Sequence, residues 1–241
     1  MFPAMTRIIQ LTAVLAIATA SCSQQPAADY FPLAENNSWS YQVSQDDRRV
    51  EVLHRSLPKE ELFGRTVYPR AISMYNALIE QDVEMEVDYF ISDESGVYLF
   101  ATRDPRQLEP VANPSPTFSY AYPVKAGTTW EEMYEGQAFG DETPVPLRNV
   151  IEGTDFTVMV PAGTFNDCLK YTGTGEINTA KGKLAVTVTQ WYAPDVGLVK
   201  YMLSETTDND SFRGVNLTVV LMESSLVVNG PQTSRQVSPK P

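Results

Sequence analysis

The stretch Leu184-Ala185-Val186-Thr187-Val188-Thr189 decides the fold, because aliphatic residues alternate in it with small or polar ones. In an extended chain successive side chains point to opposite faces, so the three large aliphatic side chains share one face. The same period of two recurs at residues 85–91, 156–160 and 217–221. This alternation is typical of antiparallel strands that have one face in the core and the other in water.

The rest of the chain supports the same secondary structure. Further strands are expected at residues 38–44, 48–56, 66–74, 96–102, 146–153, 167–173 and 198–206. No long segment has the spacing of a helix, and residues 73–80 are the best candidate for a short one. We therefore predict an all-β fold: an antiparallel curved sheet, an open barrel or a sandwich built from two related halves.

Two pairs of similar segments indicate an internal duplication. Pro32–Trp39 and Pro123–Trp130 both run from proline through an aliphatic residue, two variable positions, Asn or Gly and two small polar residues to Trp. Val87–Val97 and Val188–Leu198 also align, in the same order along the chain. The two offsets are 91 and 101 residues. A repeat of about 95 residues, with an insertion near residues 134–146, explains both.

The repeated segments contain residues with a structural and a functional interpretation. Gly96 and Gly197 lie between an acidic residue and an aliphatic run, which predicts hairpin turns. Trp39, Trp130 and Trp191 are expected to pack in the core, since packing and a partner for the indole N–H account for a buried Trp. A ligand-binding role for these tryptophans is the alternative.

These features give the predicted organisation of the chain. Residues 105–116 contain four prolines and separate the repeats, and the polar C-terminal end has little reason to fold. The predicted parts are a signal peptide at 1–21, a tether at 22–29, a first β repeat at 30–104, a Pro-rich connection at 105–119, a second β repeat at 120–228 and a disordered tail at 229–241.

The segment from Arg7 to Cys22 has the layout of a secretory signal, with one base, a short apolar run and small residues. It resembles a bacterial lipoprotein signal with the lipobox Thr19-Ala20-Ser21-Cys22, in which Thr19 replaces the usual bulky residue. The resemblance implies a diacylglycerol on the Cys22 sulfur and stable membrane anchoring. An ordinary signal cut near Ala20 is the main alternative. A membrane span is disfavoured, because the apolar run is about half of the ~20 residues required.

The charge and the residue after the lipobox bear on location and partners. Ser23 follows the cysteine, which in enterobacterial sorting favours the outer membrane over the inner one. The net charge is −12, and removing residues 1–21, which hold one base and no acid, makes it −13. This balance argues against nucleic acid and against anionic lipid headgroups as partners. We predict a cell-envelope protein that contacts the membrane through acyl chains, with an envelope protein or an apolar ligand as a further partner.

A second resemblance lies in the body of the chain. Val160–Cys168 and Gln190–Lys200 resemble a signature of exported bacterial lipoproteins with β-rich domains of the open-barrel kind that includes lipoprotein carriers. The resemblance brings no catalytic residue and no cofactor. Once Cys22 is acylated, Cys168 is the single cysteine left, and we expect it to be buried as a small hydrophobic residue rather than reactive.

Signals for catalysis or metal binding are few. His54 is the single histidine, and we expect it to have a structural role on a strand. Asp208-Asn209-Asp210 lacks the later Gly and Glu of a calcium loop and is expected to be a solvated turn. The acidic residues around the insertion are expected to form a solvated loop, with a cation site as the alternative. They are Glu131, Glu132, Glu135, Asp141 and Glu142.

The function predicted from these observations is a non-enzymatic, membrane-anchored envelope lipoprotein that acts as a binding or scaffolding module. The alternatives are a hydrolase that acts on an envelope polymer and a carrier of an apolar ligand. We predict no catalytic residue, no metal ligand and no cofactor, so lipidated Cys22 is the one functional residue predicted.

Overall fold

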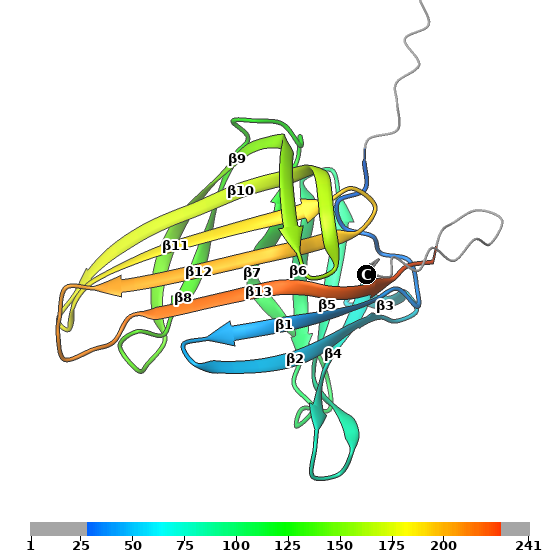
Figure 1. The fold of residues 1–241 in the computed structure, drawn as a ribbon, viewed down its shortest axis with the longest axis horizontal. Coiled ribbons are helices and arrows are strands. Elements are labelled where there is room, and N and C mark those ends of the chain that lie inside the picture. Colours follow the sequence, from blue (N-terminus) through cyan, green and yellow to red (C-terminus); the bar gives the residue numbers. More distant parts are fainter. Residues whose placement is uncertain (1–27, 228–241) are drawn as a thin grey trace, which may run out of the picture.

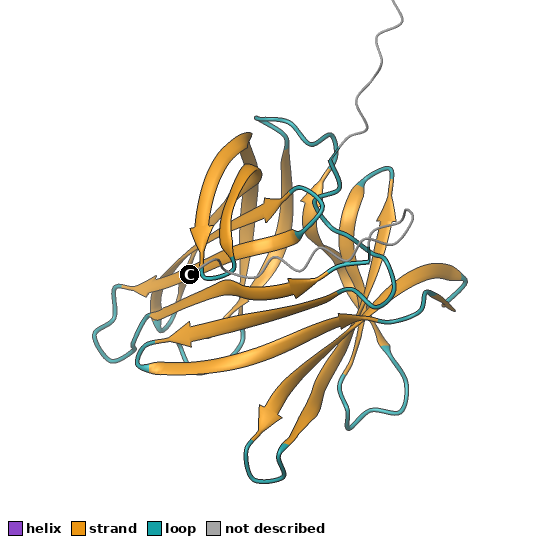
Figure 2. Ribbon diagram, turned by 45° about the vertical axis from the view of Figure 1, so that its right-hand side comes forward, coloured by secondary structure: helices purple, strands orange, loops and turns teal. Residues whose placement is uncertain are grey.

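The alternating segments form antiparallel strands of one sheet, which curves into a nearly closed barrel (Figures 1 and 2). The computed structural model describes residues 28–227. The predicted signal peptide, Cys22, most of the tether and the tail at 229–241 lie outside the described residues. Between residues 28 and 227 every regular element is a strand. The predicted all-β class is confirmed, and the architecture is the open barrel.

The strands have the following bounds. They are β1 Ser38–Gln45, β2 Arg48–Ser56, β3 Glu60–Leu62, β4 Arg65–Asn76, β5 Gln81–Asp93, β6 Gly96–Arg103, β7 Val111–Ala121, β8 Thr129–Gly136, β9 Thr143–Val160, β10 Gly163–Thr179, β11 Gly182–Ala193, β12 Gly197–Thr207 and β13 Val215–Ser225. The stretch that opened the sequence analysis lies on β11, where Leu184, Val186 and Val188 are buried and Thr187 is exposed.

The order of strands around the barrel is simple. It runs β7-β6-β5-β4-β2-β1-β13-β12-β11-β10-β9-β8, while β3 pairs with β4 alone. Strands that follow one another in the chain therefore pair, with three exceptions: β2 pairs with β4 rather than with the short β3, β7 and β8 do not pair, and the first strand meets the last. The β1–β13 ladder places Tyr41 opposite Leu221 and joins the first strand to the last. The sheet thus consists of two six-stranded meanders, which we call the first meander (β1, β2 and β4–β7) and the second meander (β8–β13).

The barrel has a seam between β7 and β8, which form no backbone ladder with each other. The Phe118 N–H on β7 instead donates to Glu132 Oε2 on β8 at 3.1 Å. The rings of Phe118 and Trp130 also meet across the seam, with centroids 6.4 Å apart. Pro114 and Pro116 lie on β7 and have no N–H to give to a ladder. Side chains, rather than main-chain bonds, therefore close the barrel here.

Aromatic side chains fill much of the concave face. The ring of Trp130 is 4.8 Å from that of Tyr171, which stacks on Tyr192 at 6.3 Å. Gly173 on β10 makes room for a neighbour, because a Cβ there would collide with Asn149 Oδ1 on β9. This packing explains why β10 carries a glycine in the middle of a strand, where glycine otherwise costs stability.

The two meanders place the paired sequence segments at matching positions. Trp39 is the second residue of β1, and Trp130 is the second residue of β8. Gly96 and Gly197 open β6 and β12 with positive φ angles of 144° and 97°, in the hairpin turns expected from the sequence. The duplication itself, and the repeat boundaries drawn from it, stay a prediction.

The structure differs from the sequence-based expectation in two places. Residues 73–80 form no helix, since β4 continues to Asn76 and a tight turn leads into β5 at Gln81. The expected Pro-rich connection at 105–119 is shorter, because residues 111–119 belong to β7. An edge strand tolerates proline, because the missing N–H faces no partner. Proline content alone therefore predicted a loop where the chain forms an edge strand.

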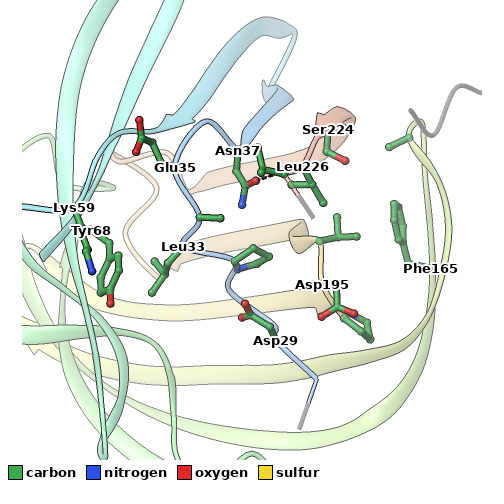
Figure 3. Close-up of a pocket in the computed structure, with 16 residues that line it drawn as sticks. Asp29, Leu33, Glu35, Asn37, Lys59, Tyr68, Phe165, Asp195, Ser224 and Leu226 are labelled. Atoms are coloured by element: carbon green, nitrogen blue, oxygen red, sulfur yellow. Dashed lines mark hydrogen bonds between the residues drawn. The ribbon is translucent and has the colours of Figure 1, made fainter. Parts of the chain in front are cut away.

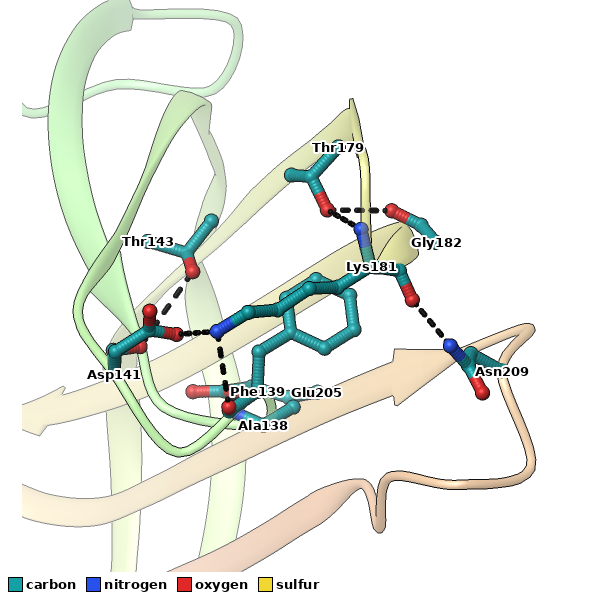
Figure 4. A network of polar contacts seen from close by, with 9 residues as sticks. All are labelled: Ala138, Phe139, Asp141, Thr143, Thr179, Lys181, Gly182, Glu205 and Asn209. Atoms are coloured by element: carbon teal, nitrogen blue, oxygen red, sulfur yellow. Dashed lines mark hydrogen bonds and ion pairs between the residues drawn. The ribbon is translucent and has the colours of Figure 1, made fainter.

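A loop at residues 137–142 covers the end of the barrel opposite the first and last described residues. A buried carboxylate on β12 holds this loop. Glu205 is fully buried and accepts hydrogen bonds from the N–H groups of Gln137 at 2.9 Å and Ala138 at 2.7 Å. Tyr134 Oη donates to the same carboxylate at 2.7 Å. Lys181 Nζ secures the loop from outside through Asp141 at 2.6 Å (Figure 4).

Candidate functional site

A cavity of about 1070 Å³ lies at the barrel end where β1 and β12 begin and β13 ends, and we call it the main cavity. The segment at residues 29–37 runs along it, between Tyr68 on one side and Phe165 on the other (Figure 3). Most of its lining residues are apolar. The lining consists of Asp29, Pro32, Leu33, Ala34, Glu35, Asn37, Lys59, Tyr68, Ala162, Phe165, Pro194, Asp195, Val196, Ser224, Leu226 and Val227.

A second cavity of about 580 Å³, the side cavity, adjoins the main one. Asp29 and Leu33 line both cavities. The remaining walls of the side cavity come from the segment before Leu33, the end of β5, the start of β6, the end of β7, the β7–β8 connection and β9. They are Ala28, Tyr30, Phe31, Ser92, Val97, Tyr120, Tyr122, Val124 and Thr154. The two cavities therefore meet at the first described residues of the chain.

Aromatic residues fix the segment that separates the cavities. Tyr30 and Phe31 are buried in the core, and Tyr30 Oη donates to the Asp167 carbonyl at 3.0 Å. Arg70 on β4 is 7% exposed, and its guanidinium lies 4.3 Å from the Phe31 ring and donates to the Pro32 carbonyl at 3.2 Å. A buried guanidinium on aromatic faces keeps favourable electrostatic contacts without an ion pair. The segment is therefore a fixed wall.

Hydrogen bonds also tie the segment to the end of β2 and to the residues just after β13. Asn37 is buried, and its Oδ1 accepts the Val227 N–H at 2.7 Å. Its carbonyl accepts the Ser56 N–H at the end of β2 at 2.8 Å. The first and last described residues thus lie at the same end of the barrel, beside the main cavity.

Two carboxylates share one wall of the main cavity. The Asp195 N–H donates to the Asp29 carbonyl at 2.7 Å, which brings the β11–β12 turn against the N-terminal segment. Asp29 Oδ1 accepts the Phe31 N–H at 2.9 Å. Burial, and to a smaller extent the charge of Asp195, raise the pKa of Asp29 above its usual value. Neither aspartate could be recognised as a cavity residue from the sequence. Each belongs to a polar turn or loop segment, and the two come together only in the folded chain.

The tryptophans singled out in the sequence line no part of either cavity. Trp39 is 1% exposed and donates from Nε1 to the Val196 carbonyl at 2.7 Å, so it supports the cavity wall from behind. Trp130 is buried against Tyr171. Trp191 is partly exposed between Lys170 and Lys200, whose ammonium groups lie 5.7 Å and 5.2 Å from its ring. Packing accounts for all three positions.

His54 and Cys168 have the structural roles expected from the sequence. The His54 ring packs edge-on against Tyr41 at 4.9 Å, and burial together with the charge of Arg70 lowers its pKa to about 3. It is therefore uncharged at neutral pH. Cys168 is fully buried, and burial raises the pKa of its thiol to about 11. Such a thiol carries almost no thiolate at neutral pH and is a poor nucleophile.

The acidic residues considered as a possible cation site lie apart from one another in the structure. Glu132 lies at the seam and Asp141 pairs with Lys181, whereas Glu131, Glu135 and Glu142 are exposed to solvent. The turn at Asp208–Asp210 is tied to β11 by a hydrogen bond from the Lys183 N–H to Asp208 Oδ1 at 2.7 Å. Within residues 28–227 no group of three or more His, Cys, Asp or Glu side chains is placed to hold a metal ion.

Asp88 on β5 is a half-buried acid that the sequence did not single out. It lies across from Arg70 in the β4–β5 register, and Thr102 Oγ1 donates to its Oδ1 at 3.4 Å. Partial burial, and then the charge of Glu86, raise its pKa from the usual range of an aspartate to about 7. Because the folded state holds this proton more tightly than the unfolded state, folding stability falls as pH rises from about 4 to about 7.

We expect Asp88→Asn to raise the free energy of unfolding at pH 8 by about 1–3 kcal/mol, and to change it little at pH 4. At pH 8 the substitution removes a half-buried charge, whereas at pH 4 the carboxyl of the folded protein is already neutral. Urea unfolding at the two pH values measures the difference. Asp82→Asn, at an exposed position on the same strand, is the control. Equal effects of Asp88→Asn at both pH values would contradict this assignment.

The fold and its site define a class: an antiparallel open barrel with an apolar cavity at the end where the chain enters. Residues 147–211 match the model of a family described as DUF3108-like, and this range contains both segments on which the lipoprotein resemblance rests. The recognised resemblance is therefore confirmed for this part of the second meander. No protein curated for function matches the chain.

Two solved structures are similar to this chain. A proposed lipoprotein of Parabacteroides distasonis ATCC 8503 has 14% identity and a TM-score of 0.46, and the alignment covers 83% of this chain and 100% of that one. A proposed exported protein of Bacteroides fragilis NCTC 9343 with a YmcC-like fold has 14% identity and a TM-score of 0.40, over 82% of this chain and 99% of that one. From residue 28 to residue 227, no helix is long and apolar enough to cross a bilayer.

Proposed function

We propose that this protein is a lipid-anchored module of the cell envelope that binds an apolar ligand in the main cavity. The observation that carries the proposal is the cavity itself: its volume is about 1070 Å³, and its lining is mostly apolar. Ligand sites of proteins are concave, mostly apolar and roughly 300–1,000 Å³ in volume, with a few polar groups that orient the ligand. The main cavity has these properties.

The position of the cavity supports a role at a membrane. Ala28, which lines the side cavity, follows the proposed lipidation site Cys22 closely in sequence. The intervening chain spans about 20 Å at most when fully extended. An acylated Cys22 would therefore keep the cavity end of the barrel near the bilayer, where apolar ligands are found. Ser23 after the cysteine favours the outer membrane as the proposed location.

Native mass spectrometry of the full-length protein extracted from membranes tests both parts of this proposal. We expect a mass that includes acylation of Cys22, together with a retained apolar ligand. Ala34→Trp fills the main cavity with an indole and should reduce ligand occupancy about tenfold, which corresponds to about 1.4 kcal/mol. Ala180→Trp, in the exposed turn between β10 and β11, is the matched control and should keep the ligand.

The outcomes separate the two parts. Equal ligand occupancy in both Trp variants would place the ligand elsewhere on the protein. An unmodified Cys22 thiol, still reactive toward maleimide, would contradict the lipid anchor and leave the cavity proposal to be judged by the ligand alone.

A further inference from the structure

The main cavity and the side cavity share one boundary, the chain segment from Asp29 to Leu33, which we call the partition. Tyr30 and Phe31 line only the side cavity, and Pro32 lines only the main cavity. Asp29 and Leu33 line both cavities. The proposed apolar site therefore consists of two lobes on either side of one strip of chain.

The partition is fixed at both ends. The Asp29 carbonyl accepts the Asp195 N–H at 2.7 Å, and the Pro32 carbonyl accepts a hydrogen bond from the Arg70 guanidinium at 3.2 Å. The two aromatic residues between them are buried in the core. Moving the partition aside would break these bonds and expose both rings, so a ligand that fills both lobes has to pass around it.

Each lobe is large enough to hold an apolar group of its own. The volumes are about 1070 Å³ and about 580 Å³, and ligand sites of proteins measure roughly 300–1,000 Å³. Phe165 and Val196 line the main cavity alone, whereas Val97 and Val124 line the side cavity alone. A single unbranched chain would leave one lobe in water or would have to fold back over the partition. Two chains joined at one end fill both lobes without that bend.

The outer end of the partition is in water. Asp29 and the preceding Ala28 are exposed. The joint between two chains would lie at this end, where a polar headgroup keeps its hydration instead of being buried without partners. The geometry therefore favours a ligand whose polar head stays outside while its chains enter the two lobes.

We infer that the site takes an amphiphile with two acyl chains, one in the main cavity and one in the side cavity, which straddles the partition with its polar head in water beside Asp29. This inference rests on the proposed function and adds to it the number of chains in the ligand. A phospholipid has this chemistry, and so has the diacylglycerol that the lipobox resemblance implies on Cys22.

Two probes with the same phosphocholine head and the same number of acyl carbons test the inference. Dihexanoylphosphatidylcholine has two six-carbon chains, and lauroyl-lysophosphatidylcholine has one twelve-carbon chain. Each is titrated by isothermal calorimetry, below its micelle concentration, into the full chain carrying Cys22→Ser, which cannot be acylated there. Because the apolar carbon content is equal, hydrophobic transfer alone predicts similar affinities. We expect the two-chain probe to bind about tenfold more tightly.

Tryptophan substitutions narrow one lobe at a time. Val124→Trp and Ser92→Trp narrow the side cavity alone, and Ser92 is an exposed residue near the end of β5, where a larger side chain can be accommodated. Both should bring the affinity for the two-chain probe down to that for the single-chain probe, which is expected in the larger main cavity. Ala34→Trp narrows the main cavity and should weaken both probes. Ala180→Trp lies outside both cavities and should keep the preference.

The calorimetric outcomes are distinct. Equal affinities of the two probes for the Cys22→Ser protein overturn the two-chain inference and leave the proposed function standing. A preference that survives both Val124→Trp and Ser92→Trp shows that the side cavity does not hold the second chain, and it also overturns the inference. If neither probe binds, the inference and the proposed apolar site both fail.

Native mass spectrometry of the acylated protein identifies the source of the chains. A two-chain lipid in addition to the acyl mass on Cys22 assigns the site to a separate lipid. No further lipid on the acylated protein, together with binding of the two-chain probe by the Cys22→Ser protein, assigns the lobes to the protein's own anchor. Both results support the two-chain inference, whereas a retained ligand with one chain contradicts it.

Discussion

Replacing Glu205 by alanine should cost about 3–5 kcal/mol of folding free energy, which is among the largest effects expected for a single substitution here. Its carboxylate accepts two backbone N–H groups and the Tyr134 hydroxyl in a fully buried place. Alanine would leave these three donors without acceptors, and each buried unpaired donor costs about 1–3 kcal/mol before relaxation. Urea unfolding measures the loss.

Part of this cost should appear as release of the loop at residues 137–142. Hydrogen exchange at the Gln137 and Ala138 amides reports it directly, since both donate to Glu205. Glu205→Gln keeps the size and one acceptor oxygen but turns an amide group toward the donors, so it should cost less than alanine. Unchanged exchange at both amides in the alanine variant would contradict this account of the loop.

Replacing Trp39 by alanine should also cost about 3–5 kcal/mol, because it empties a large buried site. The indole is 1% exposed, packs beneath Arg70 at 4.3 Å and donates to the Val196 carbonyl. Val196 lines the main cavity, so the same substitution should weaken ligand binding by loosening the β11–β12 turn. Urea unfolding and native mass spectrometry of the retained ligand measure the two effects.

Two further variants isolate the cause. Trp39→Phe keeps an aromatic ring but removes the N–H, and should cost about 1–2 kcal/mol. Trp191→Ala deletes the same side chain at a partly exposed position and should cost less than about 2 kcal/mol. If Trp191→Ala were as damaging as Trp39→Ala, burial would not be what distinguishes the two tryptophans.

Much of the fold could be predicted from the sequence. In a strand with one face in water, neighbouring residues alternate between apolar and polar, so the pattern shows which side chains face the core. The strands around Leu184 and Val188 follow from that pattern alone. The pattern is less informative on β7, where the tolerance of an edge strand for Pro114 and Pro116 depends on the missing neighbour. Short-range pattern also misjudged residues 73–80, where the β4–β5 ladder overrides local preference.

The candidate site could not be predicted in the same way. Its walls come from the N-terminal segment, the start of β4, the β9–β10 hairpin, the β11–β12 turn and the end of β13. Asp29 and Asp195 carry no motif, and only the bond between their backbones makes them a pair. The structural role of Glu205 could not be predicted either. An acidic residue at an inward-facing position of a strand has no partner in the local sequence, and its hydrogen-bond donors come from a loop far away in the chain.

By itself, the sequence determined that the chain is built of antiparallel strands, where its hairpins turn and which residues face inward, because these properties depend on near neighbours in the chain. The tertiary structure decided that the first strand pairs with the last, that β7 and β8 leave a seam and that a cavity forms beside the chain entry. Those properties depend on contacts between residues far apart in the chain, and no local pattern encodes them.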